Sequence, residues 1–551
     1  MPAADFVFTG GRVVTMAGDD AEAVAVRDGT IAYVGSAAGA REHVGPGTEV
    51  IDLAGRMLMP GIHDAHLHPL SGGVVLTRPT LDYARLDKAA FLDAMRGLIA
   101  REDDRPGDAW MAVDLWDATA MDEQPTRADL DALPTERPIL VVALDGHIAV
   151  ANSRALALAG VAAGTDDPPG GVITRDPGGE PTGILHDAAI ALIEERMPTP
   201  SAEQDADALR AAHEALVAAG VTSYMDASAF APELAAVAAL SDRGGLLVRC
   251  SSALTIQPEK AEDPAAMLAH LERLREEHGR PDVTLRTAKF FLDGVIEHPT
   301  QTAAMLEPYL VEEDGRWVPG PSRGPTYFEQ PVLDGAVAAL DAAGWQVHVH
   351  AIGDRATRSA LDAFEHARDR NGASGLRHTL AHMQVVDPAD IPRLGPLGVL
   401  ANLQLQWAQR DPYTVDHLAP HLGAARWQDL YPAGALRAAG ATLCGGSDWP
   451  VDPLRPFAQL ETAVTRTSAG RHGAEEPLFP AQAITLRAAL EMHTRASAFQ
   501  LHQEALTGRI APGLAADLIV LDRDLLAIPA GEIAQTGVEL TMIGGRIVHR
   551  A

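Results

Sequence analysis

The stretch GIHDAHLHP, residues 61–69, directly follows the short apolar run RMLMP and contains two histidines one residue apart, His66 and His68. Side chains at i and i+2 of a strand point to the same face, about 6–7 Å apart along the strand. Both imidazoles can therefore converge on one metal ion. Asp64 shares this parity and His63 does not, so His63 is expected to face away. A His-x-His pair is a weak signal alone, and the rest of the chain has to support it.

Composition and charge exclude several classes of protein. Apolar residues make up 47% of the 551 residues, which argues against disorder. Asp and Glu number 75 against 44 Lys and Arg, and a net charge of −31 disfavours nucleic acid and membranes as partners. The only cysteines, Cys250 and Cys444, lie in apolar runs, which predicts a reducing compartment without disulfides. Because we find neither a signal peptide nor a membrane span of about 20 apolar residues, we expect a cytoplasmic protein with a small-molecule substrate. A homodimer stays open.

The two ends of the chain share a pattern of short strands separated by glycine turns. Residues 5–55 contain DFVFTGGRVVTM and AVAVRDGTIAYVG, and the C-terminal part contains ADLIVLDRD and VELTMIGGRIVHR. Alternating apolar residues around Asp-Gly and Gly-Gly are hairpin signals. We predict one small β-sandwich domain built from both termini, residues 1–56 plus 508–551. Two unrelated β appendages are the alternative.

The middle of the chain alternates strand patterns with helix patterns, the latter marked by apolar residues at three- and four-residue spacing. Such alternation predicts parallel βαβ units, and eight strands are the number that closes a TIM-like (β/α)8 barrel. The predicted fold class is therefore α/β. An open doubly wound sheet is the competitor, but no Gly-x-Gly-x-x-Gly turn opens its first unit. The eight strand-like runs are MLMPGIHDAHLH, GVTSYMDAS, LLVRCSSALT, VTLRTAKFFLDG, WQVHVHAIGD, HTLAHMQVV, GVLANLQLQ and ATLCGGSDWP.

The segment between the first and second of these runs is too long for a single crossover. We predict that residues 57–507 form the barrel and that residues 70–215 form a lobe inserted after its first strand, over the barrel mouth. Loops at the carboxyl ends of the strands build the active sites of such barrels. The lobe is therefore expected to shape substrate specificity.

Polar side chains recur near the carboxyl ends of the predicted strands. His348 and His350 share one parity, so either can point inward, and His378 and His382 are alternatives on the next strand. Each residue has a structural explanation by itself, such as a turn-forming aspartate or a lysine at a strand edge. Taken together, polar side chains of these types at the ends of several strands favour a metal site. Besides the two histidines of the first strand, the set contains Lys289, His350, His382 and Asp448.

Several motifs resemble the amidohydrolase superfamily, and within it the amidohydrolase-3 group that includes N-substituted formamide deformylases. They are MPGIHDAHLHP, LDGHIAVANSRAL, GEPTGIL, KFFLDGVIE, HVHAIGDRA, LAHMQ, GGSDWPV and GRIAPGLAADLIVLD, and they extend over essentially the whole chain. In that family the matching positions hold one or two divalent metal ions. The resemblance implies as ligands His66, His68, Lys289, His350, His382 and Asp448.

Lys289 fits a metal site only in a modified form, because an ammonium group has no acceptor. The resemblance implies an N-carboxylated lysine as a bridging ligand, and burial beside Phe290 and Phe291 is expected to lower the pKa of its amine. Imidazole ligands favour Zn²⁺ over magnesium or calcium. Metal-bound water has a pKa of about 7, and Asp448 is expected to be the catalytic base that passes its proton to the departing nitrogen.

Further polar and aromatic residues are predicted to contact the substrate. The motif LDGHIAVANSRAL offers a polar pocket wall, a glutamate follows the fourth strand, and three tryptophans at loop positions can form an apolar sleeve. A core histidine, a solvated carboxylate and packing tryptophans are the structural alternatives. The predicted substrate-binding residues are Asp145, His147, Asn152, Glu297, Trp116, Trp407 and Trp449.

The predicted function is hydrolysis of a non-peptide amide C–N bond of a small molecule, with an N-substituted formamide as the best single substrate, through metal-activated hydroxide. Hydrolysis of another acyl bond, as in an N-acyl amino acid, carbamate, lactam or ester, is the alternative. Deamination is less expected, because deaminases of the superfamily usually lack the lysine that this chain has at Lys289. A non-catalytic scaffold is also less expected, because relatives of that kind lose ligands and this chain has all six.

Overall fold

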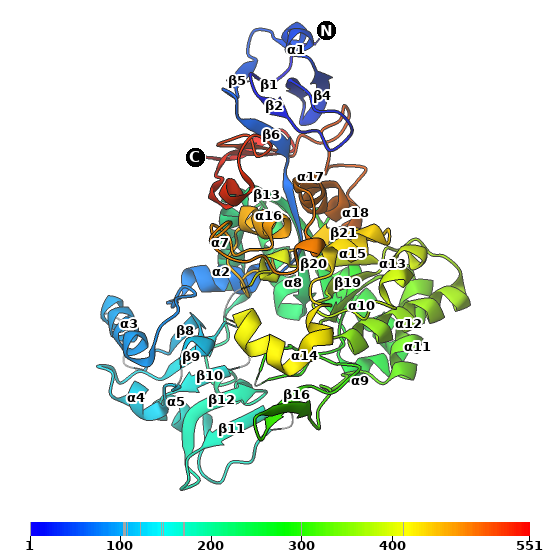
Figure 1. The fold of residues 1–551 in the computed structure, drawn as a ribbon. Coiled ribbons are helices and arrows are strands. Elements are labelled where there is room, and N and C mark those ends of the chain that lie inside the picture. Colours follow the sequence, from blue (N-terminus) through cyan, green and yellow to red (C-terminus); the bar gives the residue numbers. More distant parts are fainter. Residues whose placement is uncertain are drawn as a thin grey trace. The chain divides into compact units, whose positions relative to one another are not determined.

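The computed structural model describes residues 2–102, 106, 108–121, 123–144, 146, 148–168, 171–298, 300–410 and 413–551, drawn in Figure 1. The chain divides into two compact units. Unit 1 comprises Met1–Pro69, Ala212–Trp449 and Leu454–Ala551, and unit 2 comprises Leu70–Ala211 and Pro450–Pro453. Within the described ranges, we find no helix with the length and apolar character needed to cross a membrane.

Unit 1 contains an eight-stranded parallel sheet in the order β21-β20-β19-β18-β15-β14-β13-β7. Each of the eight predicted strand runs supplies one of these strands, which confirms the predicted α/β barrel. The strands are β7 (Ile62–Leu67), β13 (Val221–Ala229), β14 (Arg249–Thr255), β15 (Val283–Phe291), β18 (Gln346–Ala351), β19 (Thr379–His382), β20 (Leu400–Leu403) and β21 (Thr442–Gly445).

The first and last strands of this sheet meet just beyond the end of β21. The amide of Asp448 donates to the backbone oxygen of His66 at 2.8 Å, and the amide of His68 donates to that of Trp449 at 2.8 Å. A Cβ atom at Gly446 would lie 2.5 Å from the Cβ of His66, so this close approach requires glycine. The barrel is thereby nearly closed, and its closure brings Asp448 beside the first-strand histidines.

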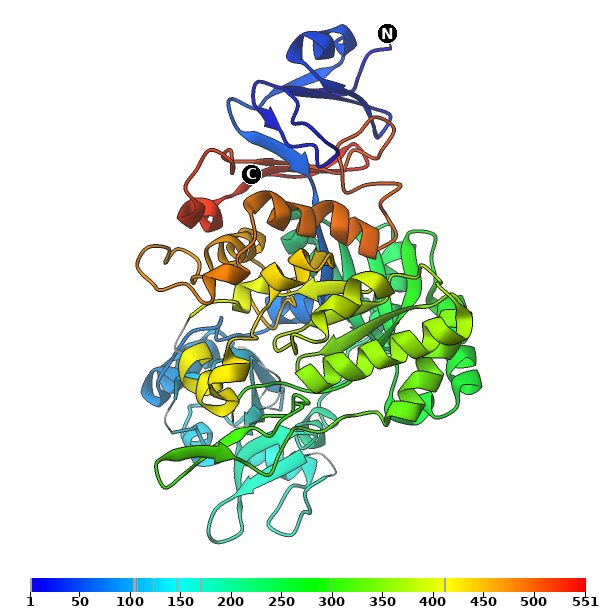
Figure 2. The ribbon, with the colours of Figure 1, turned by 45° about the vertical axis from the view of Figure 1, so that its right-hand side comes forward.

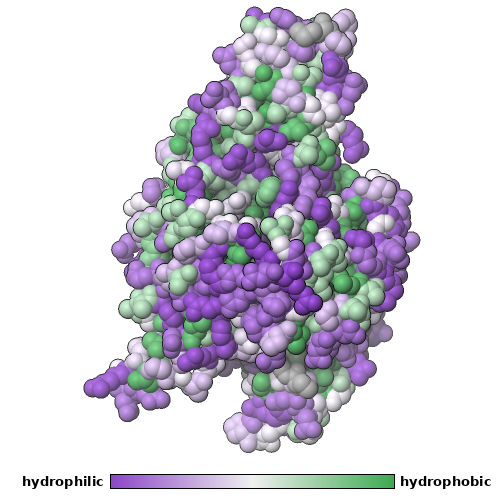
Figure 3. Space-filling view, turned by 90° about the vertical axis from the view of Figure 1, so that its right-hand side faces the viewer, coloured by the Kyte–Doolittle hydropathy of each residue, from purple (hydrophilic) through white to green (hydrophobic). Residues whose placement is uncertain are grey.

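Helices on the outside of the barrel follow the strands, as Figure 2 shows. In α12 the buried residues Ala356, Ala360, Phe364 and Ala367 recur at three- and four-residue spacing, and both α11 and α12 pack against β18. Figure 3 shows hydrophilic side chains gathered on this side of the molecule, where α10 and α12 carry exposed charged residues. The helices are α8 (Ala231–Asp242), α10 (Pro264–His278), α11 (Gln330–Ala342), α12 (Asp354–Asn371), α13 (Ile391–Leu397), α15 (Ala433–Ala438), α16 (Pro456–Thr465), α17 (Leu486–Glu491) and α18 (Ser497–Gln500).

The two ends of the chain form two further sheets in unit 1. A four-stranded sheet has the order β4-β3-β1-β5, and a five-stranded sheet has the order β2-β6-β22-β23-β24. The strands are β1 (Phe6–Thr9), β2 (Arg12–Val13), β3 (Ala23–Arg27), β4 (Thr30–Gly35), β5 (Glu49–Asp52), β6 (Met57–Pro60), β22 (Leu518–Leu521), β23 (Val538–Ile543) and β24 (Arg546–Arg550).

Both sheets contribute to one apolar core, in which Phe8 and Val24 from the first lie with Leu58, Leu518 and Leu540 from the second. N-terminal and C-terminal segments therefore share a core. The predicted boundary at residue 56 falls just before β6, and β6 pairs with β22 in the second sheet. β6 thus continues the terminal sheets before the chain enters the barrel.

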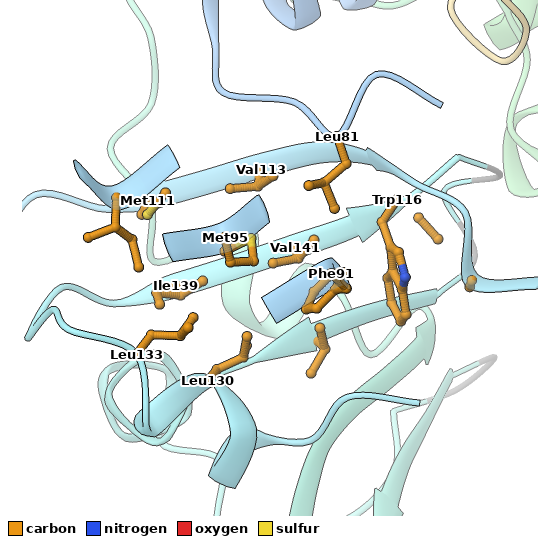
Figure 4. Close-up of a cluster of buried hydrophobic side chains, with 14 of the residues drawn as sticks. Leu81, Phe91, Met95, Met111, Val113, Trp116, Leu130, Leu133, Ile139 and Val141 are labelled. Carbon is orange, nitrogen blue, oxygen red and sulfur yellow. The ribbon is translucent and has the colours of Figure 1, made fainter. Parts of the chain in front are cut away.

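Unit 2 is built on a five-stranded sheet in the order β11-β12-β10-β9-β8, covered by α3 (Lys88–Arg101). Phe91, Met95 and Ile99 of α3 are spaced by four residues and face the sheet, where Trp116 lies 5.6 Å from the Phe91 ring (Figure 4). Trp116 is thus a core residue and not at the predicted loop position. The strands are β8 (Met111–Trp116), β9 (Ile139–Ala143), β10 (Ile148–Ala151), β11 (Gly171–Arg175) and β12 (Pro181–Asp187).

A buried histidine outside the predicted site makes the stability of unit 1 depend on pH. The His493 ring packs on Gly445 of β21, where a Cβ would lie 2.3 Å from the ring. Burial lowers the pKa of His493 from its ordinary value of 6.5 to about 4. As the pH falls, the unfolded chain binds a proton at this histidine near pH 6.5, whereas the folded chain binds it only near pH 4. The free energy of unfolding therefore decreases as the pH falls through this window.

His493→Phe keeps an aromatic ring and removes this titration. Between pH 7 and pH 5 we expect the variant to lose about 2 kcal/mol less unfolding free energy than the parent protein. Chemical unfolding of the metal-free proteins at both pH values measures the difference, because other titrating groups contribute equally to both. Parallel losses in the two proteins would contradict the prediction.

Candidate metal centre

The six predicted ligands lie on five strands of the barrel or directly after them, toward their carboxyl ends. His66 belongs to β7 and His68 follows it, while Asp448 lies three residues beyond the end of β21. The carboxyl ends of parallel strands meet at one end of a barrel, so these positions converge. The others are Lys289 on β15, His350 on β18 and His382 at the end of β19.

Three of these side chains already form a compact ligand set. Nitrogen atoms of His66 and His382 and an oxygen of Asp448 all lie within 4.8 Å of one another, and the three residues are buried. The Asp448 carboxylate lies 3.4 Å from His66 Nε2 and 3.1 Å from His68 Nε2. The His350 ring packs against that of His382, with 4.4 Å between centroids. Imidazole nitrogens with a carboxylate oxygen are a donor set that fits Zn²⁺ or a related divalent ion.

The backbone at two of these residues adopts a conformation that most side chains avoid. His382 has φ 73° and Asp448 has φ 58°, both in the left-handed region. Such conformations cost about 1–3 kcal/mol each and cluster at functional sites, where the surrounding structure enforces them. At Asp448 the conformation is held by the hydrogen bond to the His66 backbone.

Lys289 is fully buried beside this ligand set. Among the described residues its Nζ has no hydrogen-bond partner and lies 4.5 Å from the centre of the Phe291 ring. Burial lowers the pKa of Lys289 to about 7, although Asp448 and Asp226 oppose this shift. A buried ammonium without an acceptor is costly. Conversion of this lysine into a metal ligand would remove that cost. A buried amine without a hydrogen-bond partner therefore fits a metal centre.

Burial and neighbouring charges also set the protonation of the other ligands. Burial lowers the pKa of His66 and His382 well below the ordinary range, and Lys289 adds to the effect on His66. Burial acts to raise the pKa of Asp448, but His66 and His68 outweigh it and hold that pKa well below its usual range. Neutral imidazoles and an ionised carboxylate are the forms that bind a metal ion.

Each of the three buried imidazoles is held through its Nδ1 atom by a different partner. His348 Nε2 lies 2.8 Å from His66 Nδ1, Asp293 Oδ1 lies 3.2 Å from His350 Nδ1, and Gln404 Oε1 lies 2.9 Å from His382 Nδ1. Asp293 also accepts from the amides of Ala304, Ile352 and Gly353. His66 has its Nε2 beside the Asp448 carboxylate at 3.4 Å, whereas His382 has its Nδ1 3.9 Å from Asp448 Oδ2.

The partners of the ligands were not predicted from the sequence. His348 is the alternative ligand that strand parity leaves open, and the structure places its ring against His66 with a centroid distance of 4.9 Å. Asp293 follows Lys289 at the end of the same strand run, so its position was a usable signal. Gln404 has the parity of Asn402 on β20, but its side chain is uncharged and carries no metal-site signal in the sequence. His63 is buried, and its Nδ1 lies 3.1 Å from Gly61 O.

Two of the predicted tryptophans lie beside the ligands in unit 1. The Trp407 ring stacks on His382, with 5.9 Å between centroids and 22° between planes. Trp449 is buried and follows Asp448 directly. Glu297 is half-buried in the segment after β15. A role for these three residues in substrate binding stays a prediction.

The remaining predicted substrate residues belong to unit 2. Asn152 is buried, and its Oδ1 accepts from the amides of Ile139 and Ala155 while its Nδ2 donates to Arg137 O. It caps the N-terminus of α5 (Ser153–Ala159), so its side chain has a structural role in place of the predicted pocket wall. Trp116 lies in the apolar core. Asp145 and His147 lie outside the described residues.

Comparisons with known proteins match nearly the whole chain to one family. The amidohydrolase family matches residues 49–549 of the chain. The chain is 31% identical to the Bacillus subtilis protein named "Putative amidohydrolase YtcJ" over 98% of this chain and 99% of that protein. It is 29% identical to the N-substituted formamide deformylase of Arthrobacter pascens over 97% of this chain and 96% of that protein.

Solved structures give the same fold. An uncharacterized metal-dependent hydrolase from Pyrococcus horikoshii superposes with a TM-score of 0.74 at 24% identity, covering 96% of this chain and 99% of that one. At this identity the likeness concerns the fold alone. The family match over residues 49–549 and the 31% identity to the Bacillus subtilis protein show that this chain belongs to the amidohydrolase family and is a hydrolase of that type.

Proposed function

We propose that this hydrolase cleaves a non-peptide amide C–N bond of a small molecule, and that an N-substituted formamide is its substrate. The observation that carries the proposal is the buried ligand set of His66, His382 and Asp448 at the carboxyl ends of the barrel strands. The similarity to a formamide deformylase over nearly the whole chain supports the substrate class. With four imidazoles among the six predicted ligands, zinc is the proposed ion.

Asp448 is the residue that moves the proton. When bound, a divalent ion lowers the pKa of water and polarises a carbonyl group. The Asp448 carboxylate is ionised and lies at the centre of the ligand set, so it can accept a proton from the attacking water. The same carboxyl group then returns that proton to the departing nitrogen, which leaves as a neutral amine.

Lys289 is proposed to be carboxylated on Nζ. The neutral amine attacks carbon dioxide, a C–N bond forms, one proton is released, and the product is an anionic carbamate with two oxygen ligands. Burial, which lowers the pKa of Lys289 to about 7, keeps a large part of the amine neutral near neutral pH. The two carbamate oxygens would serve as ligands for one or two metal ions, which would give the buried Lys289 a role at the site.

Trp407 gives the site an apolar wall beside His382. A flat indole favours contact with an aromatic or alkyl group on the substrate nitrogen.

A substrate panel with zinc-reconstituted enzyme tests the proposal. It should contain N-substituted formamides, other amides, carbamates, esters and ring amidines, with separate assays for formate, amine and ammonia. We expect formate and amine in equal amounts from N-benzylformamide and no turnover after chelation. Ammonia release from a ring amidine, or cleavage confined to esters, would contradict the proposed bond specificity.

A further inference from the structure

The seventh barrel strand, β20, supplies no predicted ligand, yet a buried amide on this strand and another directly after it connect to the predicted ligand His382. Gln404 Oε1 lies 2.9 Å from His382 Nδ1, and Gln404 Nε2 donates to Asn402 Oδ1 at 2.8 Å. Asn402 Nδ2 donates to Ala65 O at 3.2 Å and to Gln500 Oε1 at 2.9 Å. Gln500 Nε2 donates to the same Ala65 oxygen at 3.0 Å. A continuous buried network therefore connects β7 with His382.

The direction of every bond in this network follows from the backbone oxygen of Ala65, which can only accept. It faces an N–H of Asn402, so Asn402 Oδ1 is turned toward Gln404 and must be matched by a Gln404 N–H. Gln404 Oε1 is then the atom left to face His382. Because an amide oxygen only accepts, His382 Nδ1 has to carry the proton.

We propose that Asn402 and Gln404 are positioning residues that hold His382 as the Nδ1–H tautomer and thereby leave the lone pair of Nε2 free to bind a metal ion. The inference rests on the proposed metal-dependent function and adds to it the reason why β20 matters to the site. A hydrogen-bond partner on the other ring nitrogen fixes the orientation and basicity of a ligating histidine, and its loss typically costs 10–100-fold in metal affinity.

The chain offers a matched control at the start of β18. Gln346 is as buried as Gln404, and its amide makes three hydrogen bonds, with Thr287, Arg377 and the backbone of Gln500. None of them reaches a predicted ligand. Gln346→Met and Gln404→Met therefore both remove a buried amide from the barrel, whereas only the second removes the acceptor from a ligand.

The test measures zinc affinity of the full-length protein by competition with a chromophoric chelator, together with the thermal stability of the metal-free forms. We expect Gln404→Met to bind zinc about 10–100-fold more weakly, Gln346→Met to keep its affinity within about twofold, and both to lose thermal stability. Gln404→Glu restores an acceptor opposite Nδ1, so it should bind zinc more tightly than Gln404→Met.

Unchanged affinity in Gln404→Met, an equal loss in Gln346→Met, or equal losses in Gln404→Glu and Gln404→Met would each overturn the role of the network. A parent protein that takes up no divalent ion would instead overturn the proposed function, and this inference with it. The two failures are thus distinguished by the parent protein alone.

Discussion

Asp448→Asn is expected to lower kcat by about a thousandfold or more, because the amide cannot accept the proton of the attacking water. The substitution is nearly isosteric, and asparagine tolerates the left-handed backbone that Asp448 adopts at φ 58° better than most residues. Its amide oxygen can still face a metal ion. The folded barrel and its closure through the Asp448 amide should therefore survive, and the loss should fall on kcat.

The measurement compares kcat, metal content and thermal stability in the variant and the parent enzyme at saturating zinc. Asp390→Asn is a suitable control, since this equally buried carboxylate pairs with Arg358 and Arg393 outside the barrel interior. The control should lose stability and keep kcat. If Asp448→Asn retained more than a few per cent of the parent activity with full metal content, Asp448 would not be the base.

The architecture of unit 1 was predictable because its signals are local. Apolar strand runs alternating with helical spacing gave the eight strands, and strand parity separated His66 and His68 from His63. The family resemblance then chose His350 over His348 and His382 over His378, which periodicity alone left open. Closure of the barrel through residues 447–449, and the left-handed backbone at His382 and Asp448, depend on contacts between distant strands.

The errors at Trp116 and Asn152 have different physical origins. A tryptophan at the end of a strand has the same local pattern whether it faces a core or a pocket, and the partner that decides the matter, Phe91, lies on a distant helix. Asn152, in contrast, directly precedes the helical run SRALALA, and this is the position of an N-cap. That local signal was available and favoured the structural role.

Lys289→Ala is expected to lower activity by more than about a hundredfold, and a small carboxylic acid such as propionate should restore part of it. Truncation removes the buried amine and leaves a cavity beside Phe291 in which an acid can supply the two lost oxygen ligands. Lys289→Met removes the same amine but fills the space. It should be equally inactive and should not respond to the added acid, so the pair separates rescue of the site from a general effect of the acid.

The parent enzyme provides the complementary test of the same group. Because the pKa of Lys289 is lowered to about 7, its amine is mostly neutral at pH 8 and mostly protonated at pH 6, and only the neutral form adds carbon dioxide. Metal-free enzyme reloaded with zinc should therefore regain activity faster at pH 8 with bicarbonate than at pH 6 without it. Gentle mass measurement should show one added carbon dioxide on the loaded protein. Fully metallated, active enzyme with an unmodified Lys289 would refute carboxylation and leave the lysine as a buried base whose neutral amine itself faces the metal.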